Sequence, residues 1–178
     1  MTEYRPHHLA QLNVARLRAP IDSPILADFV AALDPVNELA DSSPGFVWRL
    51  QTESGDATGV RIADDESLIV NLTVWESLDA LAAFAYRSDH VEVMRRKRTW
   101  FEPMAEAHLV LWWVPVGHLP DVGEAEVRLE ELRRHGPSAR GFTFRAPFAA
   151  PGTGAEHPGA EQRVVEGRVE AHQPDPAG

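Results

Sequence analysis

His90 is the residue of this chain whose type and position best suit acid–base chemistry. It follows Ser88-Asp89, where one helical pattern of apolar residues breaks off and a second helical segment is expected to begin. A neutral imidazole can act as a general base near pH 7, or it can ligate a metal or a haem iron. It can equally hydrogen-bond a backbone group and stabilise the break in the helix. The sequence leaves these roles open.

Arg49 and Asn71 are polar residues within otherwise apolar strands, so each must find a partner where it is buried. One interpretation is a cavity in which both side chains stabilise negative charge on a substrate, with Arg49 holding a carboxylate or a haem propionate in a forked contact. The other interpretation is a cross-strand or intersubunit hydrogen-bond network. On the first interpretation His90, Arg49 and Asn71 are the catalytic residues, and His90 removes the proton.

Aromatic and apolar side chains around His90 could form the walls of a pocket for a planar ligand, although they would also suit an ordinary core. The residues assigned to substrate binding are Trp75, Tyr86, Met94, Trp112 and His118. His118 follows the end of a strand, where a rigid element could position it for binding; it could instead hold the turn before Pro120. Neither histidine occurs in a metal-ligand spacing, so no metal site is predicted.

The strand expected over Leu68–Trp75 organises the rest of the chain. Its side chains alternate between two faces, and neither face is charged. A strand that is apolar on both faces must be covered on both. Ser77 then offers an N-cap for a helix, which carries an apolar stripe and leads to the break before His90.

The chain as a whole follows the order strand, helix, strand, strand, helix, strand. Strands are expected over His8–Leu17, Phe46–Gln51, Leu68–Trp75 and His108–Pro115, helices begin at Ser23 and Ser77, and a further short helix is expected over Gly123–His135. This order predicts an α+β, ferredoxin-like domain whose two helices cover one face of a four-stranded antiparallel sheet. Because the opposite face is also apolar, two subunits are expected to pair their sheets as a homodimeric barrel.

Composition limits the classes of function. The 178 residues carry a net charge of −10, which opposes general binding to nucleic acids or anionic membranes. The absence of cysteine excludes disulfides and cysteine-ligated metals. There is no apolar run near the roughly 20 residues that span a bilayer and no signal-peptide pattern, so a cytoplasmic protein is expected. Residues 1–146 are predicted to form the domain, and residues 147–178 a largely disordered, Pro/Gly-rich tail.

Several segments together resemble one known family. They are LAQLNVARLRAP, SPGFVWRLQ, LIVNLTVWES, FAYRSDHVEVMRRKRTWF, LWWVPVGHLP and EAEVRLEEL. In this combination the chain, from about Leu9 to Phe144, resembles the domain-of-unknown-function family DUF3291, which looks like a branch of the dimeric α+β barrel superfamily. That superfamily is similar in plan to antibiotic-biosynthesis monooxygenases, haem-degrading monooxygenases, chlorite dismutases and stress-response barrel proteins. The resemblance implies no established reaction.

By this resemblance a ligand pocket lies between the sheet and the helices, as in the oxygenase relatives. Its walls would include parts of Leu68–Trp75, the helix over Tyr86–Phe101 and the strand around Trp112. The expected function is that of a small-molecule enzyme, an oxygenase or isomerase that acts on a hydrophobic aromatic metabolite and requires no cofactor. Two alternatives stay open: a haem-binding protein with His90 as the axial ligand, and a barrel that binds a small molecule without catalysis.

Overall fold

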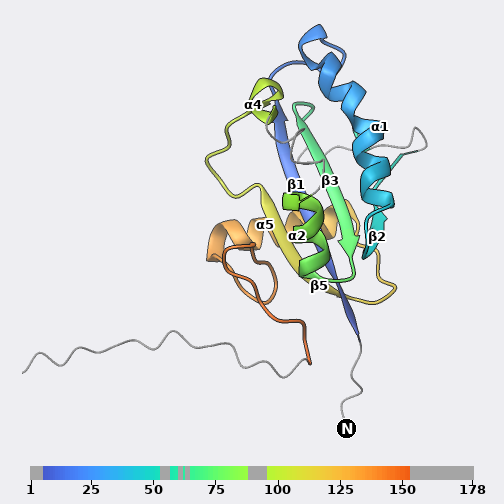
Figure 1. Cartoon of the computed structure of the whole chain (residues 1–178). Helices are drawn as coiled ribbons and strands as arrows, with labels where there is room; N and C mark the ends of the chain where they lie inside the picture. Colours follow the sequence, from blue (N-terminus) through green and yellow to red (C-terminus); the bar gives the residue numbers. More distant parts are fainter. Residues whose placement is uncertain (1–5, 53–56, 60–61, 63–64, 88–95, 153–178) are drawn as a thin grey trace, which may run out of the picture.

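The computed structural model describes residues 6–52, 57–59, 62, 65–87 and 96–152 (Figure 1). Its elements are β1 (His7–Leu17), η1 (Pro24–Leu26), α1 (Ala27–Asp41), β2 (Phe46–Arg49), β3 (Leu68–Trp75), α2 (Leu78–Arg87), α4 (Lys97–Trp100), β4 (Phe101–Glu102), β5 (Leu109–Pro115) and α5 (Val122–His135). His90 and Met94 lie outside the described residues.

The strands form one antiparallel sheet in the order β2-β3-β1-β4, and β5 also pairs with β1. β1 therefore lies at the centre, with β3 on one side and β5 on the other. The predicted α+β class with a ferredoxin-like antiparallel sheet is confirmed. Several boundaries differ by one or two residues. The helix expected to reach Phe101 ends at Trp100, because Phe101–Glu102 leaves the helix and pairs with the end of β1.

The pairing of β1 with β3 decides which side chains share a face. Asn13 lies opposite Asn71, and Gln11 lies opposite Thr73. Because side chains in a strand alternate between faces, these four polar residues lie on the same face of the sheet. That face is covered by α1 and α2, which pack on it through a cluster that includes Ala40, Leu81 and Phe84.

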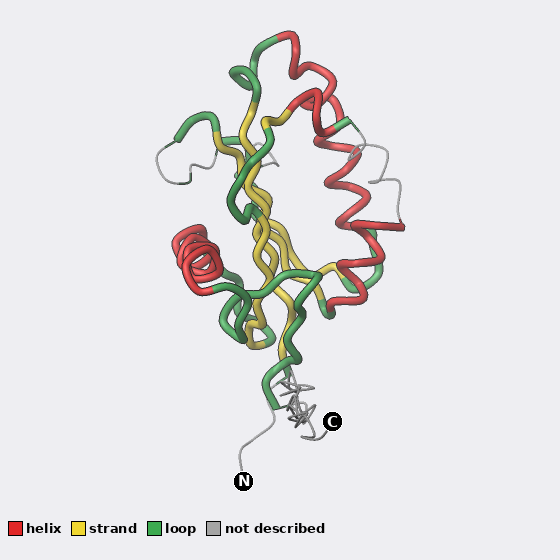
Figure 2. Tube along the Cα trace, turned by 90° about the vertical axis from the view of Figure 1, so that its left-hand side faces the viewer, coloured by secondary structure: helices red, strands yellow, loops and turns green. Residues whose placement is uncertain are grey.

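The opposite face is covered by the chain itself. Ala125, Leu129 and Leu132 of α5 join the cluster that contains Leu12 and Leu72, and the latter are 0% and 1% exposed. Figure 2 shows α5 on one side of the sheet and the other helices on the opposite side. The expectation that this face is left bare for a second subunit is therefore wrong. The homodimer stays a prediction, and the burial of this face no longer supports it.

The segment after α5 returns to the edge of β5. Gly136 (φ 75°) ends α5 in a conformation that favours glycine. Phe142 then exchanges two backbone hydrogen bonds of 2.8 Å with Leu111, and the indole of Trp113 donates to the carbonyl of Phe148 at 2.8 Å. The ring of Phe148 also packs against that of Phe142, with the ring centres 6.0 Å apart and the planes tilted by 39°. Packing thus continues two residues past the boundary expected at residue 146.

None of the described helices is long and apolar enough to cross a membrane.

The start of β3 is fixed by the carboxylate of Asp65. It accepts hydrogen bonds from the hydroxyl and the backbone N–H of Ser67, at 2.6 and 2.8 Å, and from the guanidinium of Arg16 at 2.9 Å. These bonds, with Ser67 contributing most, lower the pKa of Asp65 from 3.8 to about 2. Because the pKa is depressed in the folded state, ionised Asp65 stabilises the fold above pH 3.8, and this stabilisation is lost as the pH falls to about 2.

We therefore expect Asp65→Asn to lower the melting temperature at neutral pH and to have a smaller effect in acid. Thermal unfolding followed by circular dichroism from about pH 7 to about pH 2 measures both. The exposed neighbour Glu66→Gln is the matched control. A difference between wild type and Asp65→Asn that does not shrink below pH 3.8 would contradict the role assigned to this carboxylate.

Candidate functional site

A cavity of about 400 Å³ lies between the sheet and the helices α1 and α2. Its walls are mostly aromatic and aliphatic, and include Phe29, Leu33, Leu81, Phe84, Trp100 and Leu109. Small-molecule sites have volumes of about 300–1,000 Å³ and combine apolar walls with a few polar groups. The cavity falls within this range, and it occupies the side of the sheet on which the sequence predicted a pocket.

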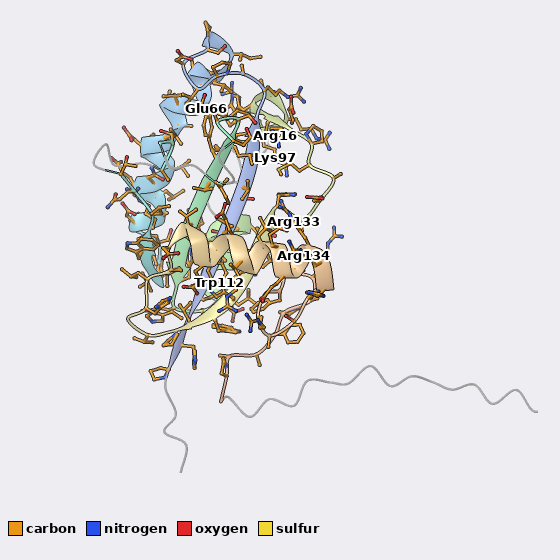
Figure 3. All side chains as sticks on the ribbon, turned by 180° about the vertical axis from the view of Figure 1, so that it is seen from behind. Arg16, Glu66, Lys97, Trp112, Arg133 and Arg134 are labelled. Atoms are coloured by element: carbon orange, nitrogen blue, oxygen red, sulfur yellow. The ribbon has the colours of Figure 1, made fainter. Side chains whose placement is uncertain are left out.

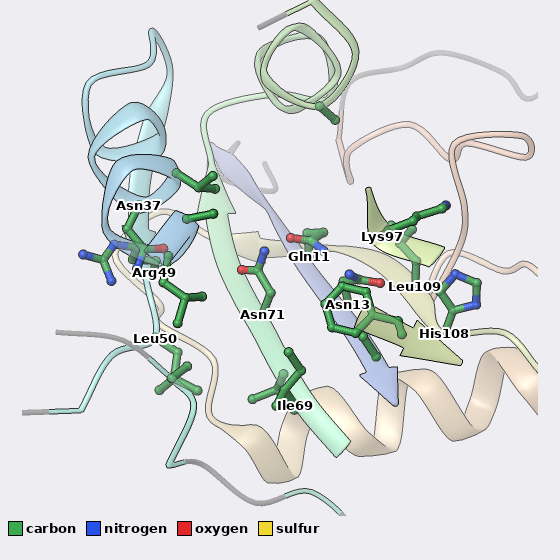
Figure 4. A pocket seen from close by; sticks show the side chains of 18 of the residues that line it. Gln11, Asn13, Asn37, Arg49, Leu50, Ile69, Asn71, Lys97, His108 and Leu109 are labelled. Atoms are coloured by element: carbon green, nitrogen blue, oxygen red, sulfur yellow. The ribbon is translucent and has the colours of Figure 1, made fainter. Parts of the chain in front are cut away.

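The floor of the cavity carries three side-chain amides. Gln11 and Asn13 come from β1 and Asn71 from β3, and Figure 4 shows them next to one another on the sheet. The register explains the grouping, since Asn13 faces Asn71 directly and Gln11 is two residues along the same strand. The cavity therefore has a polar strip across a mostly apolar surface.

The orientation of the Gln11 amide follows from a buried chain of hydrogen bonds. The indole N–H of Trp75 donates to the hydroxyl of Thr73 at 2.9 Å, and that hydroxyl lies 2.7 Å from Oε1 of Gln11. An indole N–H can only donate, so the Thr73 hydroxyl accepts there and gives its single proton to Oε1. Oε1 of Gln11 is therefore occupied, and the Nε2 amino group is the end that remains for the cavity.

Asn13 and Asn71 make no side-chain hydrogen bond within the residues that the structure describes. Asn13 is half-buried, Asn71 is exposed, and both line the cavity. Each amide can donate two hydrogen bonds through its NH₂ and accept two through its carbonyl oxygen. Together with Nε2 of Gln11, they offer a cluster of donors to a ligand oxygen that lies on the floor.

Arg49 lines the cavity at the end of the floor nearest to α1, but its guanidinium is bound to Asp41. Nε lies 2.8 Å from Oδ1 and a terminal nitrogen lies 3.2 Å from Oδ2, which is a forked contact. The Arg49 side chain is 14% exposed and that of Asp41 is 46% exposed. The Arg49 guanidinium, which was predicted to bind a substrate carboxylate, thus already binds the carboxylate of Asp41.

The predicted aromatic residues divide into three positions. Tyr86 lines the cavity, is 63% exposed, and packs edge-on against Phe144 at 5.4 Å. Trp75 is on the same face of the sheet but is fully buried between Phe46 and Phe84, whose ring centres lie 5.3 and 5.1 Å from its own. It does not line the cavity, and its indole N–H donates to the hydroxyl of Thr73. Trp112 does not reach the cavity.

Trp112 and His118 lie on the opposite side of the sheet, and the expectation that they line the pocket needs correction. The indole of Trp112 donates to Oε1 of Glu124 at 2.9 Å, and Nε2 of His118 lies 2.6 Å from Oε2 of the same carboxylate. Figure 3 shows Trp112 beside α5. The reason is the alternation of β5, which places Trp112 with Val110 and Val114 against α5. His118 therefore has the structural role of holding the turn before α5.

Two of the predicted site residues, His90 and Met94, lie outside the described part of the chain. The haem alternative depends on His90, so the structure does not test it. Within the described ranges, no three His, Asp or Glu side chains are grouped so that they could hold a metal ion. Lys97 and His108 line the cavity and were not among the predicted site residues. Lys97 was missed because it belongs to a run of four basic residues, which predicted the solvent-exposed end of a helix.

The fold and its cavity define a ferredoxin-like α+β protein with an amide-floored pocket between sheet and helices. Residues 8–158 match the family model described as Domain of unknown function (DUF3291). The chain belongs to the DUF3291 family, as its segments predicted. A search of curated proteins found no match.

Solved structures with a similar chain trace have low sequence identity to this protein. SnoaB from Streptomyces nogalater, described as a cofactor-independent oxygenase, is 18% identical, with a TM-score of 0.44 over 64% of this chain and 98% of that one. PA3566 from Pseudomonas aeruginosa is 11% identical, with a TM-score of 0.44 over 66% and 99%. A protein from Nitrosomonas europaea that is described as a putative antibiotic biosynthesis monooxygenase is 18% identical. Its TM-score is 0.39 over 67% of this chain and 96% of that one.

Proposed function

We propose that this protein is a small-molecule enzyme, an oxygenase or isomerase, that binds a hydrophobic aromatic metabolite between its sheet and helices. One observation carries the proposal: amide groups without partners in the described part of the chain lie on the floor of an apolar cavity of about 400 Å³. A half-buried amide such as that of Asn13 loses part of its hydrogen bonding to water, and a ligand that supplies an acceptor or donor restores it.

The floor favours a ligand that carries a carbonyl or phenolic oxygen. Nε2 of Gln11 presents N–H donors because Oε1 is held by Thr73. Asn13 and Asn71 can turn their NH₂ groups toward the same oxygen. Fixed donors of this kind stabilise negative charge that develops on a substrate oxygen when a neighbouring C–H or O–H loses its proton. Both an oxygenase and an isomerase reaction could begin with such an anion.

In the proposed mechanism His90 removes the proton, Asn71 stabilises the resulting anion, and Arg49 acts as a positioning residue. The roles of His90 and Asn71 are those that the sequence suggested. The role of Arg49 changes, because its forked contact with Asp41 leaves it as a fixed dipole at the end of the floor. The reaction as proposed needs no cofactor from the protein.

The polar floor is tested by two ligands of nearly the same shape. We expect 2-naphthol to bind about tenfold more tightly than naphthalene, because one or two hydrogen bonds to the amides contribute about 1–1.5 kcal/mol. The double substitution Asn13→Leu/Asn71→Leu removes two of the three amides, so it should reduce this preference and leave naphthalene binding intact. Titration calorimetry, and quenching of tryptophan fluorescence, to which Trp100 in the cavity wall contributes, measure both.

The control is Gln51→Leu, which removes an exposed amide that is not part of the cavity lining. This variant should keep the full preference for 2-naphthol. Equal affinity of the wild type for the two ligands would contradict the assignment of the amides as ligand-binding groups. Absence of any binding by either ligand would contradict the proposed function as a whole.

A further inference from the structure

We infer that the ligand of this cavity is an acid: an aromatic carboxylate whose negative charge is bound by Lys97. The inference rests on the proposed function and narrows its substrate class. It assigns to Lys97 the contact that the sequence suggested for Arg49, and it follows from the charges around the cavity.

The charged groups of the cavity are unlike those of the whole chain. The protein has 27 acidic residues and a net charge of −10. Among the described residues that line the cavity, none is Asp or Glu, while Arg49 and Lys97 are both cations. A protein with this overall charge repels an anionic ligand at long range, so a local cation without a nearby carboxylate is needed to bind one.

Of these two cations, Lys97 is the one without a counter-charge among the described residues. Arg49 is bound to Asp41 through two nitrogens. Lys97 makes no ion pair within the described part of the chain. The positive charge available to a ligand in the cavity is therefore that of Lys97.

Lys97 is also the one lysine in a sequence that has sixteen arginines. Described arginines such as Arg16 and Arg140 are bound to carboxylates on the protein surface. Arginine suits such fixed pairs because its planar group forms forked contacts, whereas lysine is a compact charge on a flexible stem. A flexible cation at the rim of a cavity can follow a ligand as it enters, which a paired guanidinium cannot.

The backbone that carries Lys97 is held firmly on both sides. Arg96 pairs with Asp28 of α1 and lies over the ring of Trp100, at 5.2 Å from its centre. The carbonyl of Arg98 accepts a hydrogen bond from Arg18 at 2.9 Å. These contacts fix the short helix α4 against β1 and α1, so the position from which the Lys97 side chain starts is well defined.

The layout of the cavity sets how an acid would lie in it. Figure 4 shows Lys97 with His108 and Leu109 at one side of the cavity, Arg49 at the other, and the amides between them. The ring of the ligand would lie against the apolar walls, an oxygen would meet the amides, and the carboxylate would point to the Lys97 side. An aromatic acid with a phenolic or carbonyl oxygen across the ring satisfies all three.

The test compares 2-naphthoate with 2-naphthamide, which have the same ring and nearly the same shape but differ in charge. We expect wild-type protein near pH 7 to bind the acid about tenfold more tightly, the effect of one charge-assisted hydrogen bond. Lys97→Met should remove this preference and leave amide binding unchanged. Lys97→Arg should keep most of it, which separates the charge from the shape of the side chain.

The matched control is Arg98→Met, which removes the same charge from the next residue, an exposed side chain that does not line the cavity. It should keep the preference for the acid. A preference lost equally in both variants would show a general effect of net charge and overturn the inference. Equal binding of acid and amide by the wild type would overturn it while the proposed function stands. Absence of binding by both ligands overturns the two together.

A second measurement uses the fact that Lys97 is the only lysine. Acetylation of Lys97, measured by mass spectrometry against the N-terminal amine of the same molecules, reports how accessible its ammonium is. We expect saturating 2-naphthoate to slow acetylation of Lys97 at least fivefold relative to the N-terminus, and the same concentration of acetate to have no effect. An unchanged rate in the presence of bound 2-naphthoate would overturn the contact.

Discussion

Leu129→Asp is expected to leave the protein largely unfolded under conditions in which the wild type is stable. Leu129 is 2% exposed and lies on α5 within the cluster that covers the second face of the sheet. Removal of a buried leucine costs about 2–5 kcal/mol, and a carboxylate placed there adds several more. Small domains have a total stability of about 5–15 kcal/mol, so this loss is comparable to the whole.

The matched control is Val127→Asp, which makes the same kind of change on the same helix. Val127 is 54% exposed, and an exposed substitution of this kind changes stability by about 0.5 kcal/mol or less. Urea unfolding followed by circular dichroism compares the two variants. Similar losses in both would mean that helix propensity dominates and that α5 does not cover the sheet. A mild effect of Leu129→Asp would mean that another surface, such as a second subunit, buries this face instead.

His90→Ala is expected to lower turnover of an aromatic substrate by a factor of about 10²–10⁴, the contribution of a general base. The variant should still bind 2-naphthol with nearly the affinity of the wild type, because the proposed contacts of the ligand oxygen are with the amides. His118→Ala is the control. His118 is bound to Glu124 on the other side of the sheet, so this variant should keep full turnover.

The measurement is oxygen uptake and product mass for a panel of phenols, with the wild type and both variants at equal concentration. Equal turnover by His90→Ala and the wild type would remove His90 from the mechanism. If no phenol in the panel reacts with the wild type while 2-naphthol binds, the non-catalytic barrel is favoured. Purified protein with a Soret band that His90→Ala loses would favour the haem alternative instead.

The strands and their faces were predictable from the sequence, because alternation is a local property. Val70 and Leu72 do share one face of β3, and Asn71 lies on the other. Which of the two faces meets the helices was not predictable, because both are apolar along β3 and β5. This is why Trp112 was assigned to the pocket: its strand was identified correctly, and the face to which it belongs depends on packing with α5.

The grouping of the amides on the cavity floor also could not be predicted from local sequence pattern, because it depends on how two distant strands pair. Gln11 and Asn13 were visible as polar residues within a strand, and so was Asn71. That the two asparagines lie opposite each other depends on the register of β1 with β3, which local pattern does not determine. The role of α5 was missed for a related reason. Its apolar residues predicted a helix, but an amphipathic helix does not by itself specify the surface on which it packs.

The backbone exchange between Leu111 and Phe142 has a consequence for how molecules of this protein meet at high concentration. It satisfies the backbone N–H and C=O of Leu111 on the outer side of β5, so a strand of another molecule cannot pair at this position while the exchange is in place. In the described part of the sheet, β2 and the two-residue β4 are the other edges, and β2 has four residues with an irregular register between Phe46 and Trp48. Short, irregular edges resist the strand addition that starts fibrils. Shortening the chain before Phe142 would therefore be expected to promote aggregation even where the domain still folds.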